Sequence, residues 1–500
     1  MHRSHGMTRR KWLSGTAAGM TAMAGAGKAT RPNILLILGD NWHAKHAGIQ
    51  GDPVVRTPAF DRLAREGILF TRAFGTTPSC SPSRASLLTG QSSHRLGEGA
   101  NLWGTLPGPL VCYTDLLEGA GYRLGFAGKG WGPGAIAESG RGRNPAGPAF
   151  RSFEEFLAAG EGAQPFCFWL GSQLPHTPWQ EGRSGKTGMD TSLVRIPPHL
   201  PDHPQVRDDI LNYYCEVQAF DQQAGQAVRL LQQRGILEDT LVIMTADNGW
   251  QMPRGLAHVY DDGVHVPFAM RWGSGLPSGK RVEEFIGLED LAPTFLEAAG
   301  LPVPMAMNGR SLLPLARGGR QKNRDAVFLE RERHADVRKG HAGYPVRAVR
   351  TRDFLYIRNL RADRWPAGDP ELAYAVGPYG DIDPSPTKEL ILAHREEAGV
   401  RLSFKLCFAR RPPEELYDLR RDPGQTHNVA AEVSYAREKQ DLSRRLEDWR
   451  HRTADPRIRQ DDDAFDRMPY YGPPAGRTGS QRGREKGESP SRPPGGGSIP

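Results

Sequence analysis

The chain alternates short, continuously hydrophobic stretches with longer stretches whose hydrophobic residues recur every three or four positions. The first short stretch, residues 33–38, reads Asn-Ile-Leu-Leu-Ile-Leu and is followed by Gly-Asp-Asn. A run of this kind is typical of a buried parallel strand that ends in a functional loop. Similar runs lie at residues 123–127, 166–170, 241–245 and 266–272.

Helical patterns lie between these predicted strands. One helix is expected after Thr57-Pro58, at residues 59–66, and another at residues 113–119. The longest pattern covers residues 208–234, where a hydrophobic stripe at helical spacing ends before Gly235. Strands that alternate with helices predict a layered α/β domain with a mostly parallel central sheet.

Polar residues follow the predicted strands at the point where each strand ends. Asp40-Asn41 follows the first strand, Lys129 the second, His176 the third and Asp247-Asn248 the fourth. In parallel sheets, ligands bind beyond the carboxyl ends of the strands. The sequence therefore predicts that these residues share one active site.

The pattern changes after about residue 318. Short strands are expected at residues 326–330, 346–350 and 354–357, and a helix at residues 433–453. We therefore predict a catalytic α/β domain over residues 31–325 and a smaller α+β domain over residues 326–456. Residues 457–500 contain few large hydrophobic side chains and are expected to form a disordered tail.

Residues 1–30 read as an export signal. Arg9-Arg10 forms a twin-arginine pattern, and a mildly hydrophobic run of small residues follows it. The pattern predicts a periplasmic or secreted protein, and a disordered basic arm is the alternative. No later stretch has the ~18 consecutive hydrophobic residues of a membrane span.

The net charge of +8 would by itself suggest a nucleic-acid partner, but most of this charge lies at the two ends of the chain. Residues 1–30 carry five Lys and Arg and no acid, and residues 471–500 carry a net charge of +3. The remaining chain is close to neutral, which argues against nucleic-acid binding. The five cysteines are widely spaced without a CxxC pair, so neither a disulfide framework nor a zinc cluster is expected.

The most specific segment is Ser79-Cys80-Ser81-Pro82-Ser83-Arg84, which continues to Thr89-Gly90. Pro82 can open a helix, and Arg84 then lies one turn beyond Cys80, so both side chains can face one point. A helix N-terminus beside a guanidinium can receive a tetrahedral oxyanion. The alternative is a buried structural cysteine near a surface arginine.

This segment resembles the signature of the formylglycine-dependent type I sulfatases, C-x-P-S-R followed by T-G. The resemblance extends over about residues 31–450. It is strongest with the heparan N-sulfatase, or N-sulfoglucosamine sulfohydrolase, branch of the family. Further matching segments are Gly128-Lys129-Gly130-Trp131, Pro175-His176-Thr177-Pro178 and Thr245-Ala246-Asp247-Asn248-Gly249.

The resemblance implies an alkaline-phosphatase-like fold and a nucleophile made by a maturation enzyme, which oxidises Cys80 to formylglycine. It also implies that Arg84 belongs to the catalytic site, that Lys129 clamps the sulfate and that His176 lies near the leaving oxygen. Hard oxygen ligands suit Ca²⁺ or Mg²⁺ and not zinc. The implied metal ligands are Asp40, Asn41, Asp247, Asn248 and Cys80 as formylglycine.

The sequence departs from the family pattern at three positions. Asn41 stands where the family usually has a second aspartate, which removes one anionic metal ligand. Trp131 replaces a histidine that supports the nucleophile, and Leu256 replaces a basic residue. Arg254, His258, His43 and His46 are the nearby basic residues that could substitute.

Three functions remain open at this point. The first is hydrolysis of sulfate esters or sulfamates, with sulfated saccharides as substrates. The second is hydrolysis of phosphonates or phosphodiesters, because related enzymes share the fold and the modified cysteine. The third is a catalytically silent protein that binds sulfated glycans, which the residues at Trp131 and Leu256 favour.

Overall fold

The computed structural model describes residues 31–160, 164–179, 182, 185, 187–371, 377–458 and 463–472. The predicted export signal at residues 1–30 lies outside the described residues. The helices are α1 (Pro58–Glu66), α2 (Cys80–Thr89), α3 (Tyr113–Gly119), α4 (Phe153–Ala158), α5 (Pro204–Gln233), α6 (Asp261–Val264), α7 (Leu291–Ala298), α8 (Leu313–Ala316), α9 (Pro386–Ala393), α10 (Arg401–Cys407) and α11 (Ala436–Arg452).

A central sheet forms the frame of the larger part of the molecule. Its strand order is β3-β4-β1-β5-β6-β2-β7, and β8 also pairs with β2. The strands are β1 (Asn33–Gly39), β2 (Ile68–Phe74), β3 (Arg123–Gly128), β4 (Phe166–Gly171), β5 (Thr240–Ala246), β6 (His265–Arg271), β7 (Lys280–Val282) and β8 (Ile286–Gly287).

The pairing confirms a mostly parallel sheet. Strand β1 lies between β4 and β5 and is parallel to both, and β3 is parallel to β4. Strand β6 is the exception, because it runs antiparallel to β5 and to β2. The carboxyl ends of β1, β3, β4 and β5 therefore meet at one edge, as the sequence predicted.

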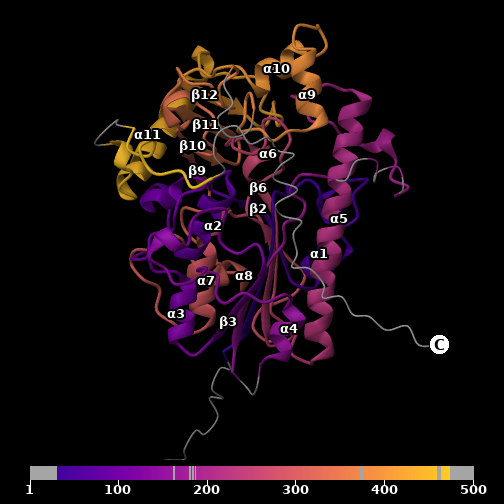
Figure 1. The fold of residues 1–500 in the computed structure, drawn as a ribbon, viewed down its shortest axis with the longest axis vertical. Coiled ribbons are helices and arrows are strands. Elements are labelled where there is room, and N and C mark those ends of the chain that lie inside the picture. Colours follow the sequence, from indigo (N-terminus) through magenta and orange to yellow (C-terminus); the bar gives the residue numbers. More distant parts are fainter. Residues whose placement is uncertain are drawn as a thin grey trace, which may run out of the picture.

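Helices cover both faces of this sheet (Figure 1). One group contains α1, α4 and the long α5, and the other contains α2, α3, α7 and α8. Helix α5 begins at Pro204, where the His203 side chain accepts a hydrogen bond from the Gln205 N–H. Its start lies four residues before the predicted start at residue 208.

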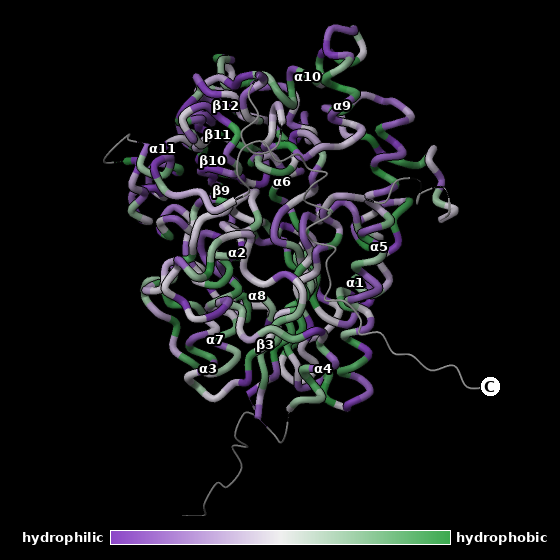
Figure 2. The backbone as a smooth tube through the Cα atoms, in the orientation of Figure 1, coloured by the Kyte–Doolittle hydropathy of each residue, from purple (hydrophilic) through white to green (hydrophobic). Residues whose placement is uncertain are grey.

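The hydrophobic core follows the central strands. Residues 34–38 of β1 have no exposed surface, because helices cover the strand on both faces. Figure 2 shows the hydrophobic residues gathered along these strands and on the helix faces that cover them. None of the described helices is both long and hydrophobic enough to cross a membrane. All five cysteines are free and buried.

A second sheet lies above the first in Figure 1 and contains four antiparallel strands in the order β12-β11-β10-β9. They are β9 (Ala326–Arg331), β10 (Val346–Thr351), β11 (Phe354–Asn359) and β12 (Glu414–Asp418). Helix α11 packs on this sheet through Leu446 and Trp449. The sequence predicted three of these strands and α11, but it missed β12, α9 and α10.

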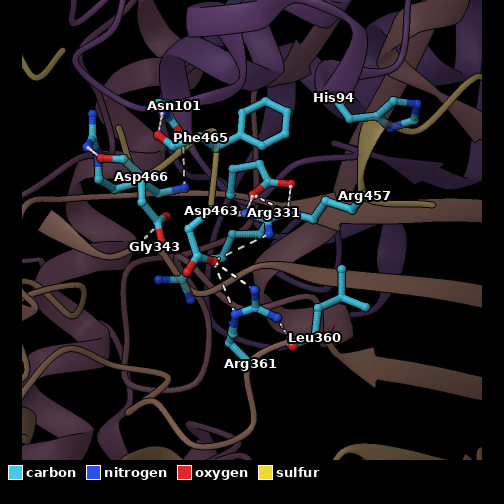
Figure 3. A network of polar contacts seen from close by, with 12 residues as sticks. His94, Asn101, Arg331, Gly343, Leu360, Arg361, Arg457, Asp463, Phe465 and Asp466 are labelled. Atoms are coloured by element: carbon cyan, nitrogen blue, oxygen red, sulfur yellow. Dashed lines mark hydrogen bonds and ion pairs between the residues drawn. The ribbon is translucent and has the colours of Figure 1, made fainter. Parts of the chain in front are cut away.

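The expectation of a disordered tail from residue 457 is wrong for its first part. Arg457 is buried and pairs with Glu332, with Nη2 2.7 Å from Oε2. Residues 463–472 pack against the rest of the protein, and Phe465 is 3% exposed (Figure 3). The Asp466 carboxylate accepts a hydrogen bond from the Gly343 N–H at 2.8 Å. A few well-placed side chains thus order a segment whose overall composition is polar.

Candidate active site

Helix α2 places Cys80 at a helix N-terminus inside the protein. Every residue of this helix is buried, and Cys80 is 4% exposed. Ser79 enters the helix with extended backbone, and Gly90 ends it with a φ of 64°, in the left-handed region that favours glycine. Because the first N–H groups of a helix have no intrahelical partner, this end attracts an anion.

The ends of β1 and β5 bring two pairs of oxygen-bearing residues beside Cys80. Gly39 lies opposite Ala246 in the parallel ladder, so the residues that follow are neighbours. The Asp247 Oδ1 accepts hydrogen bonds from the Asn41 N–H at 3.2 Å and from Asn248 Nδ2 at 3.0 Å. The adjacent parallel strands therefore bring together the four residues predicted as metal ligands.

Two cations balance the two carboxylates of this cluster. The Arg84 Nε donates to Asp247 Oδ2 at 2.7 Å, and its Nη2 lies 3.8 Å from Asp40 Oδ1. The Lys129 Nζ donates to Asp40 Oδ2 at 2.5 Å. The Arg84 Nη1 also donates to the carbonyls of Lys129 and Gly130, at 2.8 and 2.9 Å. The guanidinium is thereby fixed between β5 and the loop after β3.

The site stabilises a charged Asp40 but a neutral Cys80. Burial alone would raise the pKa of Asp40, yet Lys129, His176 and Arg84 hold it well below its ordinary value. Burial, followed by the nearby Asp40 carboxylate, raises the pKa of the Cys80 thiol well above its ordinary value. An unmodified Cys80 is therefore a poor nucleophile at neutral pH, because the thiolate is the reactive form.

The donor atoms of this cluster fit a hard cation. Asp40 and Asp247 are 1% and 0% exposed. The buried Asn248 Oδ1 has no hydrogen-bond partner among the described residues, which is costly unless another group binds it. Ligand atoms of Asp40, Cys80 and His176 lie within 4.8 Å of one another. Carboxylate and amide oxygens are the ligands that Ca²⁺ takes in proteins.

His176 lies in the loop after β4 and is fixed by its neighbours. Its Nδ1–H donates to the Thr177 carbonyl at 2.6 Å, which fixes the orientation of the ring. The Gln251 Nε2 lies 3.3 Å from this His176 Nε2. The Thr177 N–H donates to Gln251 Oε1 at 2.5 Å and so orients the amide.

The structure does not bring the four basic residues considered as substitutes into contact with Cys80. The Arg254 guanidinium lies 3.6 Å from the centre of the Tyr260 ring and donates to the Leu406 carbonyl. His258 Nδ1 donates to the Leu256 carbonyl at 3.0 Å. His43, His46 and Arg254 line a separate cavity of about 260 Å³. Trp131 and Leu256 are both buried.

Three residues of the site were missed by the sequence reasoning. The Oγ of Ser79, which precedes Cys80, lies 2.8 Å from His334 Nδ1. Gln251 contacts His176, and its Nε2 also donates to Asp383 Oδ2. Gln251 lies four residues after Asp247, which was a usable signal. His334 and Asp383 lie in loops without any such pattern.

The family comparison agrees with this geometry. The model of the sulfatase family matches residues 32–134 and 148–301, which together are just over half of the chain. A second model, described as the C-terminal part of N-sulphoglucosamine sulphohydrolase, matches residues 249–369. The chain belongs to the sulfatase family, and by class it is a sulfuric ester hydrolase.

Two curated relatives show how far the similarity extends. The N-sulphoglucosamine sulphohydrolase of Homo sapiens is 28% identical over 489 residues, which cover 86% of this chain and 92% of the relative. An ulvan-active sulfatase of Formosa agariphila is 28% identical over 440 residues, which cover 84% of this chain and 80% of the relative. The similarity therefore includes both sheets.

Solved structures share the fold at lower identity. One, determined with its substrate D-glucosamine-2-N,6-O-disulfate, has a TM-score of 0.60 and 19% identity, covering 87% of this chain and 99% of that chain. A phosphonate monoester hydrolase from Silicibacter pomeroyi has a TM-score of 0.62 and 20% identity, covering 84% and 96%. These similarities confirm the alkaline-phosphatase-like layered fold.

Proposed function

We propose that this protein hydrolyses sulfate esters or sulfamates of saccharides. The observation that carries the proposal is the convergence of Cys80, Arg84 and Lys129 on one buried point beside the Asp40 and Asp247 carboxylates. Two fixed cations at a helix N-terminus can hold a sulfate and stabilise the charge that develops on its oxygens. His176 lies on one side of that point, where it can face the leaving group.

Residue 80 is proposed to act after oxidation to formylglycine by a maturation enzyme. The raised pKa of the Cys80 thiol supports this, because the unmodified side chain stays protonated at neutral pH. The hydrated aldehyde would supply a hydroxyl nucleophile at the same place. Arg84 and Lys129 then orient the sulfate towards residue 80, and their charges do not depend on the modification.

A Ca²⁺ ion, with Mg²⁺ as the alternative, is proposed between the ends of β1 and β5. Asp40, Asn41, Asp247 and Asn248 would hold it together with the modified residue 80. The unsatisfied Asn248 Oδ1 and the two buried carboxylates support this set. When bound, such an ion polarises a sulfate oxygen. Asn41 supplies one charge fewer than the usual aspartate, which predicts weaker metal binding.

The saccharide class rests on the relatives. The names of the two curated relatives point to sulfated glucosamine and to ulvan, and one fold neighbour was solved with a disulfated glucosamine. We propose a sulfated saccharide, with N-linked or O-linked sulfate. A sulfamate releases an amine, which needs a proton to depart. His176, on the leaving-group side of the site, is the residue proposed to supply or position that proton.

A phosphonate or phosphodiester is the second candidate substrate, because phosphonate monoester hydrolases share the fold. One experiment separates the candidates. The matured protein is incubated with N-sulfoglucosamine, glucosamine 6-O-sulfate, an aryl sulfate and an aryl phosphonate ester, and free sulfate or phenol is measured. Sulfate release from a glucosamine supports the proposal. Turnover of the phosphonate alone would overturn it, and glycan binding without any turnover would favour a silent protein.

Export is also proposed, on the basis of Arg9 and Arg10. A twin-arginine signal directs a folded protein across a membrane. The periplasm or the extracellular space is where a sulfated polysaccharide would be met.

A further inference from the structure

A carboxylate from the C-terminal part of the chain reaches the active-site histidine through one glutamine. The Gln251 Nε2 donates to Asp383 Oδ2 and lies 3.3 Å from His176 Nε2. Gln251 is 2% exposed, whereas Asp383 is half-buried. His176 itself belongs to the group with ligand atoms within 4.8 Å of Cys80. Asp383 is therefore linked through Gln251 to His176, the residue expected beside the leaving group.

The segment that carries Asp383 is held by buried charges. Asp381 accepts hydrogen bonds from the guanidinium groups of Arg331 and Arg338, and from the Ala335 N–H at 3.0 Å. The Lys388 Nζ donates to the carbonyls of Tyr379 and Ile382, at 3.1 and 2.7 Å. Buried charged groups are costly to desolvate, and these contacts hold the backbone on both sides of Asp383 in one place.

The Asp383 carboxylate has capacity left for a ligand. Gln251 uses Oδ2, and Oδ1 has no hydrogen-bond partner among the described residues. A carboxylate beside a site for an anion does not help to hold the sulfate, because like charges repel. It is suited to accept hydrogen bonds from hydroxyl or ammonium groups, which a sugar carries next to its sulfate.

We propose that Asp383 determines sugar specificity by accepting a hydrogen bond from a hydroxyl or ammonium group of the sugar that carries the scissile sulfate and by disfavouring a second sulfate on that group. This inference rests on the proposed function. It assigns the substrate class as a saccharide with a neutral or cationic group at that position. The alternative is a structural role, in which Asp383 only holds Gln251 and, through it, His176.

Substrate comparison separates these roles. Asp383→Asn, which keeps the shape, is assayed with glucosamine 6-O-sulfate, D-glucosamine-2-N,6-O-disulfate and 4-nitrophenyl sulfate, which has no hydroxyl groups. We expect kcat/KM for the monosulfated sugar to fall roughly 10- to 100-fold, as for loss of a charge-assisted hydrogen bond. Activity on the aryl sulfate should stay within about twofold, and the ratio of disulfate to monosulfate turnover should rise.

Equal losses on the sugar and on the aryl sulfate would overturn the proposal, because a structural role affects every substrate alike. Asp369→Asn is the matched control, since the Asp369 carboxylate accepts a hydrogen bond from the Lys339 N–H and contacts neither Gln251 nor His176. It should leave the substrate ratio unchanged.

Measuring the affinity for substrates tests the inference even if the enzyme shows no turnover. In a Cys80→Ala background, calorimetry with glucosamine 6-O-sulfate and with 4-nitrophenyl sulfate needs no working nucleophile. Asp383→Asn should weaken binding of the sugar roughly tenfold or more and leave aryl sulfate binding unchanged. Unchanged sugar affinity would overturn the inference. If the matured wild-type protein turned over no sulfate at all, that result would instead count against the proposed function.

Discussion

The Sγ of Cys80 lies 3.3 Å from Oδ1 of Asp40, although 40 positions separate the two residues. One lies at the start of α2 and the other at the end of β1. Lys129 neutralises the other oxygen of the same carboxylate. The environment of the proposed nucleophile is therefore set by three separate segments, namely α2, the end of β1 and the loop after β3, and it can be tested one side chain at a time.

Replacement of Cys80 by alanine should remove turnover and preserve the fold. Loss of a covalent nucleophile is expected to lower kcat by several orders of magnitude. Sulfate release and the circular dichroism spectrum measure the two effects, and peptide mass spectrometry of the wild type should find formylglycine at position 80. Cys167→Ala, a buried thiol in β4, is the control and should retain activity. Wild-type turnover in Cys80→Ala would contradict the proposed nucleophile.

Removal of divalent metal should lower both activity and thermal stability. A ligand that binds only the folded state adds about 2.7 kcal/mol at a concentration 100 times its Kd. We expect EDTA to lower the melting temperature and Ca²⁺ to restore it. In Asn248→Ala, which lacks the unsatisfied amide oxygen, Ca²⁺ should produce a smaller shift. A metal-free protein with full activity, as shown by elemental analysis, would contradict the site.

Stability should fall as the pH decreases from about 6.5 towards 4. Burial lowers the pKa of His199 to about 4, and Asp262 offsets this only in part. Burial likewise lowers the pKa of His46 and His265 to about 4. Between pH 6.5, the ordinary pKa of histidine, and pH 4, these side chains bind protons in the unfolded chain but not in the folded protein. Acidification through this range therefore favours unfolding. Each such histidine contributes as much as about 3 kcal/mol across this window.

Calorimetric melting at several pH values measures this effect. His199→Gln should show a smaller decrease in melting temperature between pH 7 and pH 5 than the wild type. His427→Gln is the control, because this side chain is 73% exposed and should leave the pH dependence unchanged. An identical pH dependence in His199→Gln and the wild type would show that His199 does not contribute.

The segment 463–472 should contribute measurably to stability. Phe465 is 3% exposed, and its carbonyl accepts a hydrogen bond from Asn101 Nδ2 at 2.9 Å. Phe465→Ala is expected to destabilise the protein by about 3–5 kcal/mol, as for a large aromatic residue removed from a core. Met305→Ala, at a fully exposed side chain, should change stability by less than about 0.5 kcal/mol. Equal melting temperatures for both variants would contradict packing of this segment.

Export should depend on the twin arginines. Replacing Arg9 and Arg10 with lysine keeps the charge but removes the pair that the transport machinery reads. The double variant should accumulate as precursor inside the cell, which fractionation and immunoblotting detect. Replacing Arg3, which lies outside the pair, with lysine is the control. Normal export of the double variant would show that the pair is not a signal.

The strength of each local pattern determined which parts could be predicted. Residues 33–38 are continuously hydrophobic and form β1, and the stripe at residues 208–234 forms α5. Helices α9 and α10 have only eight and seven residues, too few for a clear helical period. Asp40 and Asp247 were predictable because each follows a buried strand. Asp383 and His334 were not, since only packing between distant loops brings them to the site.

The burial of Cys80 limits when it can be modified. In the folded chain Cys80, the first residue of α2, is 4% exposed, and His334 from the loop after β9 contacts the preceding Ser79. If residue 80 is oxidised as proposed, the oxidising enzyme needs access to a side chain that the folded protein buries. The proposed modification would then have to precede the completion of folding. A production host that lacks sufficient maturation enzyme would yield well-folded, permanently inactive protein, which later addition of that enzyme could not repair.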